Sequence, residues 1–208
     1  MMKSNALLQS WDALCARAEM IGGHDLGLDL LNCYSEPHRV YHNVEHLASV
    51  IDLLTQAEAN DRLIMAAWFH DAIYRPGATD NEARSADMAR RRLRALGCSP
   101  ASIKAVCDAV LATASHRSQD NDVAALLDAD LSILGTSAEA YRAYAAAIRK
   151  EFHDVPAAVF RAGRLAFIEA MLKRPNIYET TFFRQHFEVP ARKNLEAEAD
   201  LLRTTSSD

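Results

Sequence analysis

The spacing of apolar residues constrains the fold of this chain more than any other feature. Apolar residues recur every three or four positions almost throughout, as in Leu7, Trp11 and Leu14 and again over 44–54. This is the spacing of one face of an amphipathic helix, and the alternation typical of a half-buried strand is almost absent. The sequence therefore predicts an all-α fold.

Prolines and capping residues mark the ends of the expected helices. Beyond the N-terminal segments, helices are expected over 82–96, 101–115, 122–134, 138–152, 157–173 and 190–203. All six prolines are expected between helices: Pro37, Pro76, Pro100, Pro156, Pro175 and Pro190. Gly97 and Gly135 stand where helix C-caps are expected, and Ser99 and Ser137 where helices should begin. With 208 residues and no linker or repeat, we expect one domain over 1–203 and a frayed polar tail over 204–208.

Charge and composition narrow the classes of partner. A net charge of −5 argues against a nucleic-acid polymer or an anionic membrane, so the arginine-rich stretch 90–94 is interpreted as a solvated helix face. The longest apolar run, 63–69, is too short to span a bilayer, and the N-terminus is polar where a signal peptide is apolar. A cytoplasmic protein is expected. The four cysteines, Cys15, Cys33, Cys98 and Cys107, form no CxxC motif, which favours buried, reduced thiols.

An adjacent histidine and aspartate, His70 and Asp71, interrupt the most apolar segment of the chain. Residues 61–74 are apolar on all sides, which predicts a helix in the core. A buried carboxylate is very unfavourable unless it is paired or bound to a metal. On this segment alone, a metal site and a polar pair satisfied by the backbone and an arginine are equally good interpretations.

Other segments also place a histidine or aspartate among apolar residues, and together they favour a metal site over a satisfied polar pair. His42 and His46 share a helix face, His116 ends a predicted helix, and Asp128 and Asp130 lie in an apolar helical stretch. Imidazole and carboxylate ligands suit Mn, Mg, Fe, Ni, Co or Zn ions. Without cysteine ligands, a structural zinc site is not expected.

The order of these residues resembles a known signature. His46, then His70-Asp71, then Asp130 is similar to the H…HD…D pattern of the HD superfamily of metal-dependent phosphohydrolases. The stretches YHNVEH, AWFHDAIY, DNEARSA, TASH, DADLSILG and YAAAIRKEF resemble one bacterial subgroup of HD type, and the likeness continues to IYETTFFRQHFEVPARKNLEAE. The resemblance thus covers most of the chain.

The resemblance implies a single-domain helical bundle around one divalent metal ion. Its ligands would be His46, His70, Asp71 and Asp130. The family pattern favours His46 over His42, because an apolar valine follows it by four, and Asp130 over Asp128, because it directly precedes an apolar residue. Relatives with two metals carry extra histidines shortly after the pair. The stretch DNEARSA offers none, which favours one metal.

The implied activity is hydrolysis of a small phosphate ester or anhydride, in particular of a nucleotide, by attack of a metal-activated water. Glu82 and His116, then Asp128, are the candidate acid–base residues; as plain structural residues, Glu82 would stabilise a helix start and His116 a helix end. The residues expected to contact the substrate are Arg39, His42, Asn43, Arg75 and Arg117. Arg149 is a further candidate, and each arginine alone is more often a surface residue.

Two alternatives stay open within the same fold. One is a non-catalytic sensor of a nucleotide or a partner protein, and the other is a di-iron oxygenase, which needs more histidines than this chain offers. The sequence contains no GxSxG elbow, no phosphate-binding loop and no GxGxxG fingerprint. Apart from a small phosphorylated substrate, the sequence names no partner, and a homodimer is left open.

Overall fold

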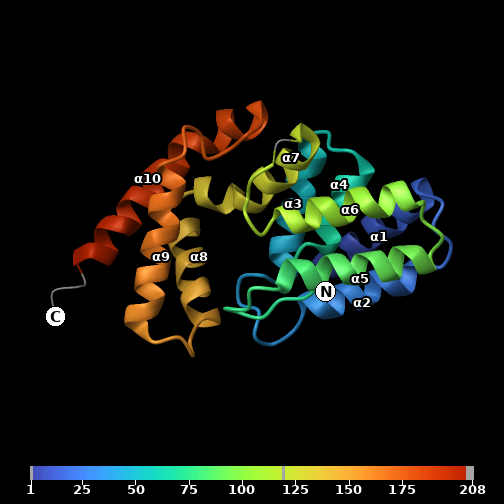
Figure 1. The fold of residues 1–208 in the computed structure, drawn as a ribbon, viewed down its shortest axis with the longest axis horizontal. Coiled ribbons are helices and arrows are strands. Elements are labelled where there is room, and N and C mark those ends of the chain that lie inside the picture. The colour runs from blue at the N-terminus through green and yellow to red at the C-terminus, as the bar shows by residue number, and fades with distance from the viewer. Residues whose placement is uncertain (1, 119, 205–208) are drawn as a thin grey trace. The chain divides into compact units, whose positions relative to one another are not determined.

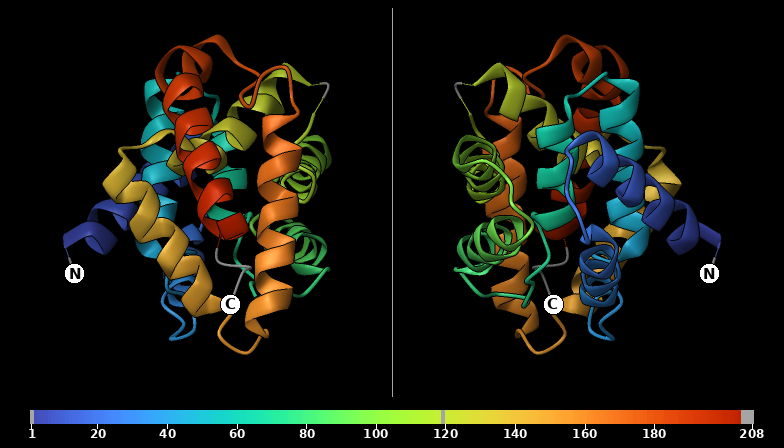
Figure 2. Two further views of the ribbon diagram at one scale, coloured as in Figure 1. Left: turned by 90° about the vertical axis from the view of Figure 1, so that its left-hand side faces the viewer. Right: turned by 90° about the vertical axis from the view of Figure 1, so that its right-hand side faces the viewer.

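Helices build the described part of the chain (Figures 1 and 2). The computed structural model describes residues 2–118 and 120–204, and these residues contain no strand. The expected all-α fold is confirmed. The helices divide into two compact units, residues 1–129 and 130–208. The expectation of a single domain over 1–203 stays a prediction.

Helix α4 lies at the centre of the first unit, in contact with α3, α5 and α6, while α1 packs against α2 and α3. The helices of this unit are α1 (Met2–Arg17), α2 (Gly23–Tyr34), α3 (Val44–Gln56), α4 (Asp61–Phe69), α5 (Asn81–Ala95), α6 (Pro100–Ala112) and α7 (Asn121–Asp130). The last residue of α7, Asp130, is the first residue of the second unit. Its backbone therefore continues a helix of the first unit.

The core position of α4 follows from its apolar surface. Trp68 and Phe69 are fully buried, and their rings lie 5.1 and 6.4 Å from the ring of Trp11 in α1. Trp11 Nε1 in turn donates a hydrogen bond of 2.7 Å to the carbonyl of Gly23. Pairs of aromatic rings at these separations stabilise a core by about 0.5–1.5 kcal/mol beyond the area that they bury. The aromatic cluster thus fixes α4 against α1 and α2.

The end of α4 corrects the prediction of one continuous core helix through His70 and Asp71. The helix ends at Phe69, and both polar residues lie in the turn that follows. Side chains from other segments replace the helical hydrogen-bond partners there. The N–H of Asp71 donates to the Tyr34 hydroxyl at 3.2 Å, and the N–H of Ile73 donates to Ser85 Oγ at 3.0 Å. These tertiary contacts, invisible in the periodicity, stop the helix.

Helix α10 contacts each of the other elements of the second unit. These elements are the 3-10 helix η1 (Leu131–Gly135), α8 (Ala138–Glu151), α9 (Ala157–Leu172) and α10 (Thr181–Thr204). The Tyr178 hydroxyl donates to the Leu131 carbonyl at 3.0 Å, and Asn194 Nδ2 donates to the Leu134 carbonyl at 2.9 Å. The segment directly after Asp130 is therefore held by the C-terminal third of the chain.

Two helix boundaries of the second unit differ from the prediction. Pro190 lies inside α10, which begins at Thr181 and not near residue 190. A proline inside a helix costs about 3 kcal/mol, and burial of Phe183 and Leu195 on either side of it outweighs that cost. The predicted helix 122–134 is divided into α7 and η1. Thr204 ends α10, and the rest of the predicted frayed tail lies outside the described residues.

Gly135, the last residue of η1, lies close against the backbone of α10. A Cβ atom at Gly135 would lie 2.5 Å from the carbonyl oxygen of Phe187. Gly135→Ala should therefore lower the free energy of unfolding in urea by about 1–3 kcal/mol through overpacking. The control is Gly163→Ala in α9, where nothing beyond the neighbouring backbone of the same helix lies within 4 Å of the new Cβ. It should raise stability by about 0.5–1 kcal/mol, because alanine favours the helix interior. Equal effects of the two substitutions would contradict the close approach.

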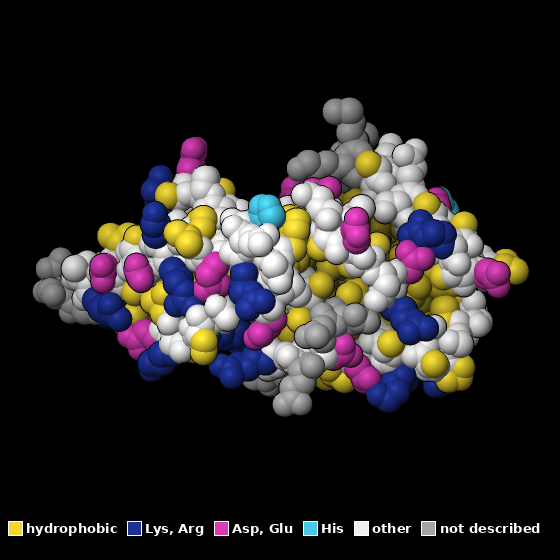
Figure 3. Space-filling model, turned by 90° about the horizontal axis from the view of Figure 1, so that it is seen from above, with side chains coloured by type: hydrophobic (Ala, Val, Ile, Leu, Met, Phe, Trp, Pro, Cys, Tyr) yellow, Lys and Arg dark blue, Asp and Glu magenta, His cyan; other side chains and the backbone are white. Residues whose placement is uncertain are grey.

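Charges of both signs are interspersed on the face seen in Figure 3. In the arginine-rich stretch of α5, Arg90 and Arg91 form exposed ion pairs with Asp87, and Arg92 forms one with Asp29. Within the described residues, no helix is both long and apolar enough to cross a bilayer. The four cysteines are unpaired thiols, and burial, with Asp12 adding to it, raises the pKa of Cys15 to about 11.

Candidate metal centre

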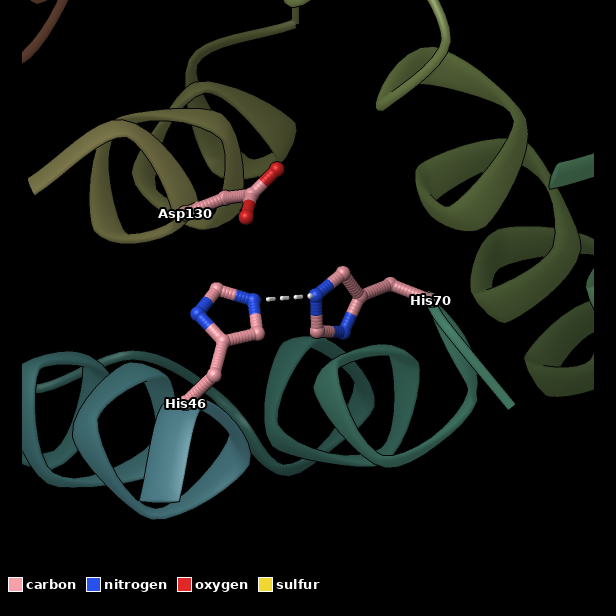
Figure 4. Close-up of side chains that lie close together, drawn as sticks. All are labelled: His46, His70 and Asp130. Atoms are coloured by element: carbon pink, nitrogen blue, oxygen red, sulfur yellow. Dashed lines mark hydrogen bonds between the residues drawn. The ribbon is translucent and has the colours of Figure 1, made fainter. Parts of the chain in front are cut away.

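Two histidines and an aspartate from three helical segments face one another (Figure 4). His46 lies in the first turn of α3, His70 directly follows α4, and Asp130 ends α7. Each offers one ligand atom, and these atoms all lie within 4.8 Å of one another. Both histidines are buried and Asp130 is half-buried. These are three of the four ligands that the resemblance implied.

Asp71, the fourth implied ligand, borders the same pair of histidines. The Nε2 atoms of His46 and His70 are 3.1 Å apart. Oδ2 of Asp71 lies 3.1 Å from His70 Nε2 and 3.6 Å from His46 Nε2. Its side chain is 13% exposed, so the carboxylate is largely withdrawn from water beside two imidazoles. A cation is the ligand that satisfies such a set of donors best.

The spacing of the two imidazole nitrogens fits one divalent ion. Imidazole nitrogens bind such ions at about 2.0–2.1 Å, so two nitrogens 3.1 Å apart subtend roughly 100° at the ion. This lies between the right angle of an octahedral site and the wider angle of a tetrahedral site. Two imidazoles with two carboxylates suit Mn, Fe, Co, Ni or Zn. The residues present can therefore hold the implied metal.

Hydrogen bonds fix the tautomer of His70. Its Nδ1 lies 2.7 Å from the Ala67 carbonyl oxygen, which can only accept, so Nδ1 carries the proton. In the neutral imidazole this leaves the lone pair on Nε2, the atom that faces His46 and Asp71. The Tyr34 hydroxyl lies 3.4 Å from the same Nδ1 and also donates to the Ala67 carbonyl at 3.3 Å. Sequence reasoning missed Tyr34, because nothing in its helix distinguishes it from an ordinary core tyrosine.

Asn43 and His42 were expected to contact the substrate, and both lie beside the centre. Asn43 is the N-cap of α3: its Oδ1 accepts hydrogen bonds from the N–H groups of Glu45 and His46, at 2.9 and 3.3 Å. The cap fixes where α3 begins and hence where His46 stands. The ring of His42 stacks on that of Tyr74, with centroids 4.2 Å apart. A role of either residue in substrate binding stays a prediction.

Three of the four arginines proposed for the substrate lie in the first unit, and they differ in placement. Arg75 and Arg117 are exposed. Arg39 is buried, and its guanidinium donates to backbone carbonyls, which favours a structural role. The backbone N–H and carbonyl of Arg75 bond the amide of Asn81 at 3.0 and 2.9 Å. The amide of Asn81, the residue at which the resemblance would place a histidine in a two-metal protein, is thus bonded to the backbone.

The acid–base candidates lie on three different segments, and none belongs to the ligand group formed by the described residues. Glu82 is half-buried in the first turn of α5. His116 follows α6 in a left-handed backbone conformation, with φ of 48°. Asp128 is buried in α7, about 200° around the helix from Asp130, so it projects away from that carboxylate. Their roles stay predictions.

A polar network around the buried Arg164 lies in the second unit. Nη1 of Arg164 donates to the Tyr144 hydroxyl at 3.0 Å, and its Nε and Nη2 donate to Glu198 at 2.9 and 3.0 Å. Burial raises the pKa of Tyr144, Arg164 opposes the rise, and the carboxylates of Glu198 and Asp130 add to it. Tyr144 is therefore a neutral hydroxyl at pH 7. This network could not be predicted from the sequence, because its members lie in ordinary amphipathic helices.

Comparison of the chain with protein-family models, curated proteins and solved structures found no match. The geometry of the site and the order of its residues are what support a metal centre. The geometry has three parts. The Nε2 atoms of His46 and His70 lie 3.1 Å apart, and the carboxylate of Asp71 borders both of them. The carboxylate of Asp130 offers an oxygen within 4.8 Å of the two histidine ligand atoms.

Proposed function

We propose that this chain is a metal-dependent phosphohydrolase that acts on a small phosphate ester or anhydride, with nucleotides as the substrate class. One observation carries the proposal: the Nε2 atoms of His46 and His70 lie 3.1 Å apart beside the carboxylate of Asp71, with an oxygen of Asp130 within reach. The H…HD…D order, which resembles that of HD-type phosphohydrolases, supports the reaction class.

His46, His70, Asp71 and Asp130 would hold the ion. A divalent ion supplies Lewis acidity to a phosphoryl oxygen and lowers the pKa of a coordinated water. The chain's own task is then to move a proton and to bind the phosphate. Glu82 or His116 would accept the proton of the attacking water. The base must lie within hydrogen-bond reach of that water when the substrate is bound.

Phosphate binding would fall to the exposed arginines. Arg75 and Arg117 carry planar guanidinium groups that can donate two parallel hydrogen bonds to one phosphate. Arg75 is held by Asn81 through its backbone alone, so its side chain is not used in that contact. The His42 ring, stacked on Tyr74 and 5.6 Å from the His46 ring, would orient the part of the substrate nearest the ion.

A metal and substrate screen tests the proposal. Elemental analysis of the purified protein should find one divalent ion per chain, because the Asn81 amide is bonded to the backbone of Arg75 and the chain offers no histidine there. A panel of nucleotides and phosphate esters, assayed with Mn, Mg, Co, Ni and Zn, should give turnover that EDTA removes. Two irons per chain would contradict the proposal in favour of an oxygenase. One ion without turnover on any phosphate would contradict it in favour of a sensor.

A further inference from the structure

We propose that Arg39 is a positioning residue of the metal centre, which locks the two ligand-bearing segments of the first unit to each other. The inference rests on the proposed centre and adds a residue outside its ligand set. The side chain of Arg39 is completely buried. It lies in the loop between α2 and α3, a place where an arginine would ordinarily be solvated.

One nitrogen of this guanidinium joins both ligand segments. Nη1 donates to the carbonyl of His42 at 3.1 Å and to the carbonyl of Asp71 at 2.7 Å. Nη2 donates to the carbonyl of Ala72 at 3.1 Å. The first carbonyl lies four residues before His46, and the second belongs to an implied ligand. Arg39 thus ties the start of α3 to the turn that carries the histidine–aspartate pair.

Three further groups hold the guanidinium in place. Nε donates to Glu36 Oε2 at 3.0 Å, which compensates the buried charge. The guanidinium carbon lies 5.2 Å from the ring centroid of Tyr34 and 5.4 Å from that of Tyr74. A planar fork between two rings can reach three carbonyls in fixed directions, which a lysine ammonium cannot do. With its donors used in this way, Arg39 is poorly placed to bind a substrate phosphate.

The spacing of the ligands depends on this clamp. His46 and His70 belong to segments that the chain itself joins only through α3, α4 and their connections. Without Arg39, the partly buried carbonyls of His42 and Asp71 and the buried carbonyl of Ala72 would lose this donor, and the turn after α4 would be free to shift away from α3. Loss of a group that orients metal ligands typically lowers metal affinity by about 10–100-fold. A shift in affinity, beyond any loss of stability, is the signature of positioning.

The second unit offers a matched control in Arg192. Nε of Arg192 donates to Glu188 Oε1 at 2.8 Å, and its two Nη atoms donate to the carbonyls of Leu172, Arg174 and Pro175 at 3.3, 2.9 and 2.9 Å. This is the same set of partners, one carboxylate and three carbonyls. It fixes the end of α9, and none of these partners is an implied ligand. Arg192→Gln therefore measures what the loss of such a clamp does to stability alone.

The experiment compares Arg39→Gln, Arg39→Lys and Arg192→Gln with the wild type. Co2+ titrations followed by visible absorption give the Kd and the spectrum of the bound ion, and urea unfolding in EDTA gives the stability without metal. Both glutamine variants should be less stable than the wild type. Only the two Arg39 variants should raise the Kd for Co2+, by about 10–100-fold, and alter the spectrum of the bound Co2+. Arg192→Gln should keep the Kd and the spectrum of the wild type.

Arg39→Lys keeps the charge and decides the matter if Arg39→Gln does not fold. A lysine variant with wild-type Kd and spectrum overturns the inference, and so do equal changes in the Arg39 and Arg192 variants. Failure of the wild type itself to bind Co2+ overturns the metal centre and the inference with it. Failure of the inference alone is thus distinct from failure of the proposed function.

Discussion

Asp71→Asn is expected to abolish the stabilisation of this protein by divalent metal. The carboxylate of Asp71 lies 3.1 and 3.6 Å from the two imidazole nitrogens that would share the ion. Asparagine keeps its shape but removes the charge that compensates a divalent cation. At a metal concentration of 100 times the Kd, the wild type should gain about 2.7 kcal/mol. Urea unfolding with and without Mn2+ should show this gain in the wild type and none in the variant.

Asp80→Asn is the control for this substitution. Asp80 is an exposed residue at the N-cap position of α5, and its side chain makes no capping hydrogen bond. The same change of charge and shape there should leave the metal-dependent gain in stability intact. An Asp71→Asn variant that gains as much stability from Mn2+ as the wild type would contradict the assignment of Asp71 as a ligand.

Glu82→Gln is expected to separate catalysis from metal binding. Glutamine preserves the size and reach of the side chain but removes the ionisable carboxylate. If Glu82 accepts the proton of the attacking water, kcat should fall by about 10²–10⁴-fold. Metal content and the free energy of unfolding should stay close to those of the wild type, because Glu82 is half-buried in the first turn of α5 and is not one of the four proposed ligands. The measurement is kcat, on a substrate found in the screen, alongside elemental analysis.

Two further variants, Glu139→Gln and His116→Gln, show whether a loss of turnover in Glu82→Gln is specific to Glu82. Glu139→Gln removes an exposed carboxylate from the first turn of α8 and tests whether a helix-end charge alone affects turnover; it should not. If Glu82→Gln stays active while His116→Gln loses activity and keeps its metal, the base is His116 and the proposed order is wrong. If neither change matters, Asp128 is the next candidate, although its direction on α7 argues against it.

Local sequence signals predicted those helix ends that local residues determine. Ser99 caps α6 with Pro100 in its first turn, Ser137 caps α8, and Gly97 follows α5 with a φ of 78°, as expected for a helix C-terminus. The helix end after α4, which was predicted wrongly, depends on partners that are distant in the sequence. The hydroxyls of Tyr34 and Ser85 accept hydrogen bonds from the N–H groups of Asp71 and Ile73 after α4. The periodicity of apolar residues does not encode such contacts.

Some residues of the candidate site could likewise be predicted from the sequence, and others could not. His46, His70 and Asp130, which the structure brings together, could be named from their order and their apolar surroundings. The role of Arg39 could not, because a sequence does not tell whether a guanidinium donates to backbone or to a substrate. Its burial decided the matter. Tyr34 likewise belongs to the centre only through the fold, since it reaches His70 from a helix far earlier in the chain.

The two tryptophans, Trp11 and Trp68, pack against each other in the core and provide an intrinsic fluorescence signal. Both tryptophans of the chain belong to the first unit, and Trp68 stands two residues before His70. Its Nε1 is buried without a hydrogen-bond partner among the described residues, so it emits from a dry, apolar setting. Intrinsic fluorescence therefore follows the unit that carries the two histidines, whereas far-ultraviolet ellipticity follows the helices of both units. Where the two signals change together, the units unfold as one cooperative body, and where they part, each has a stability of its own.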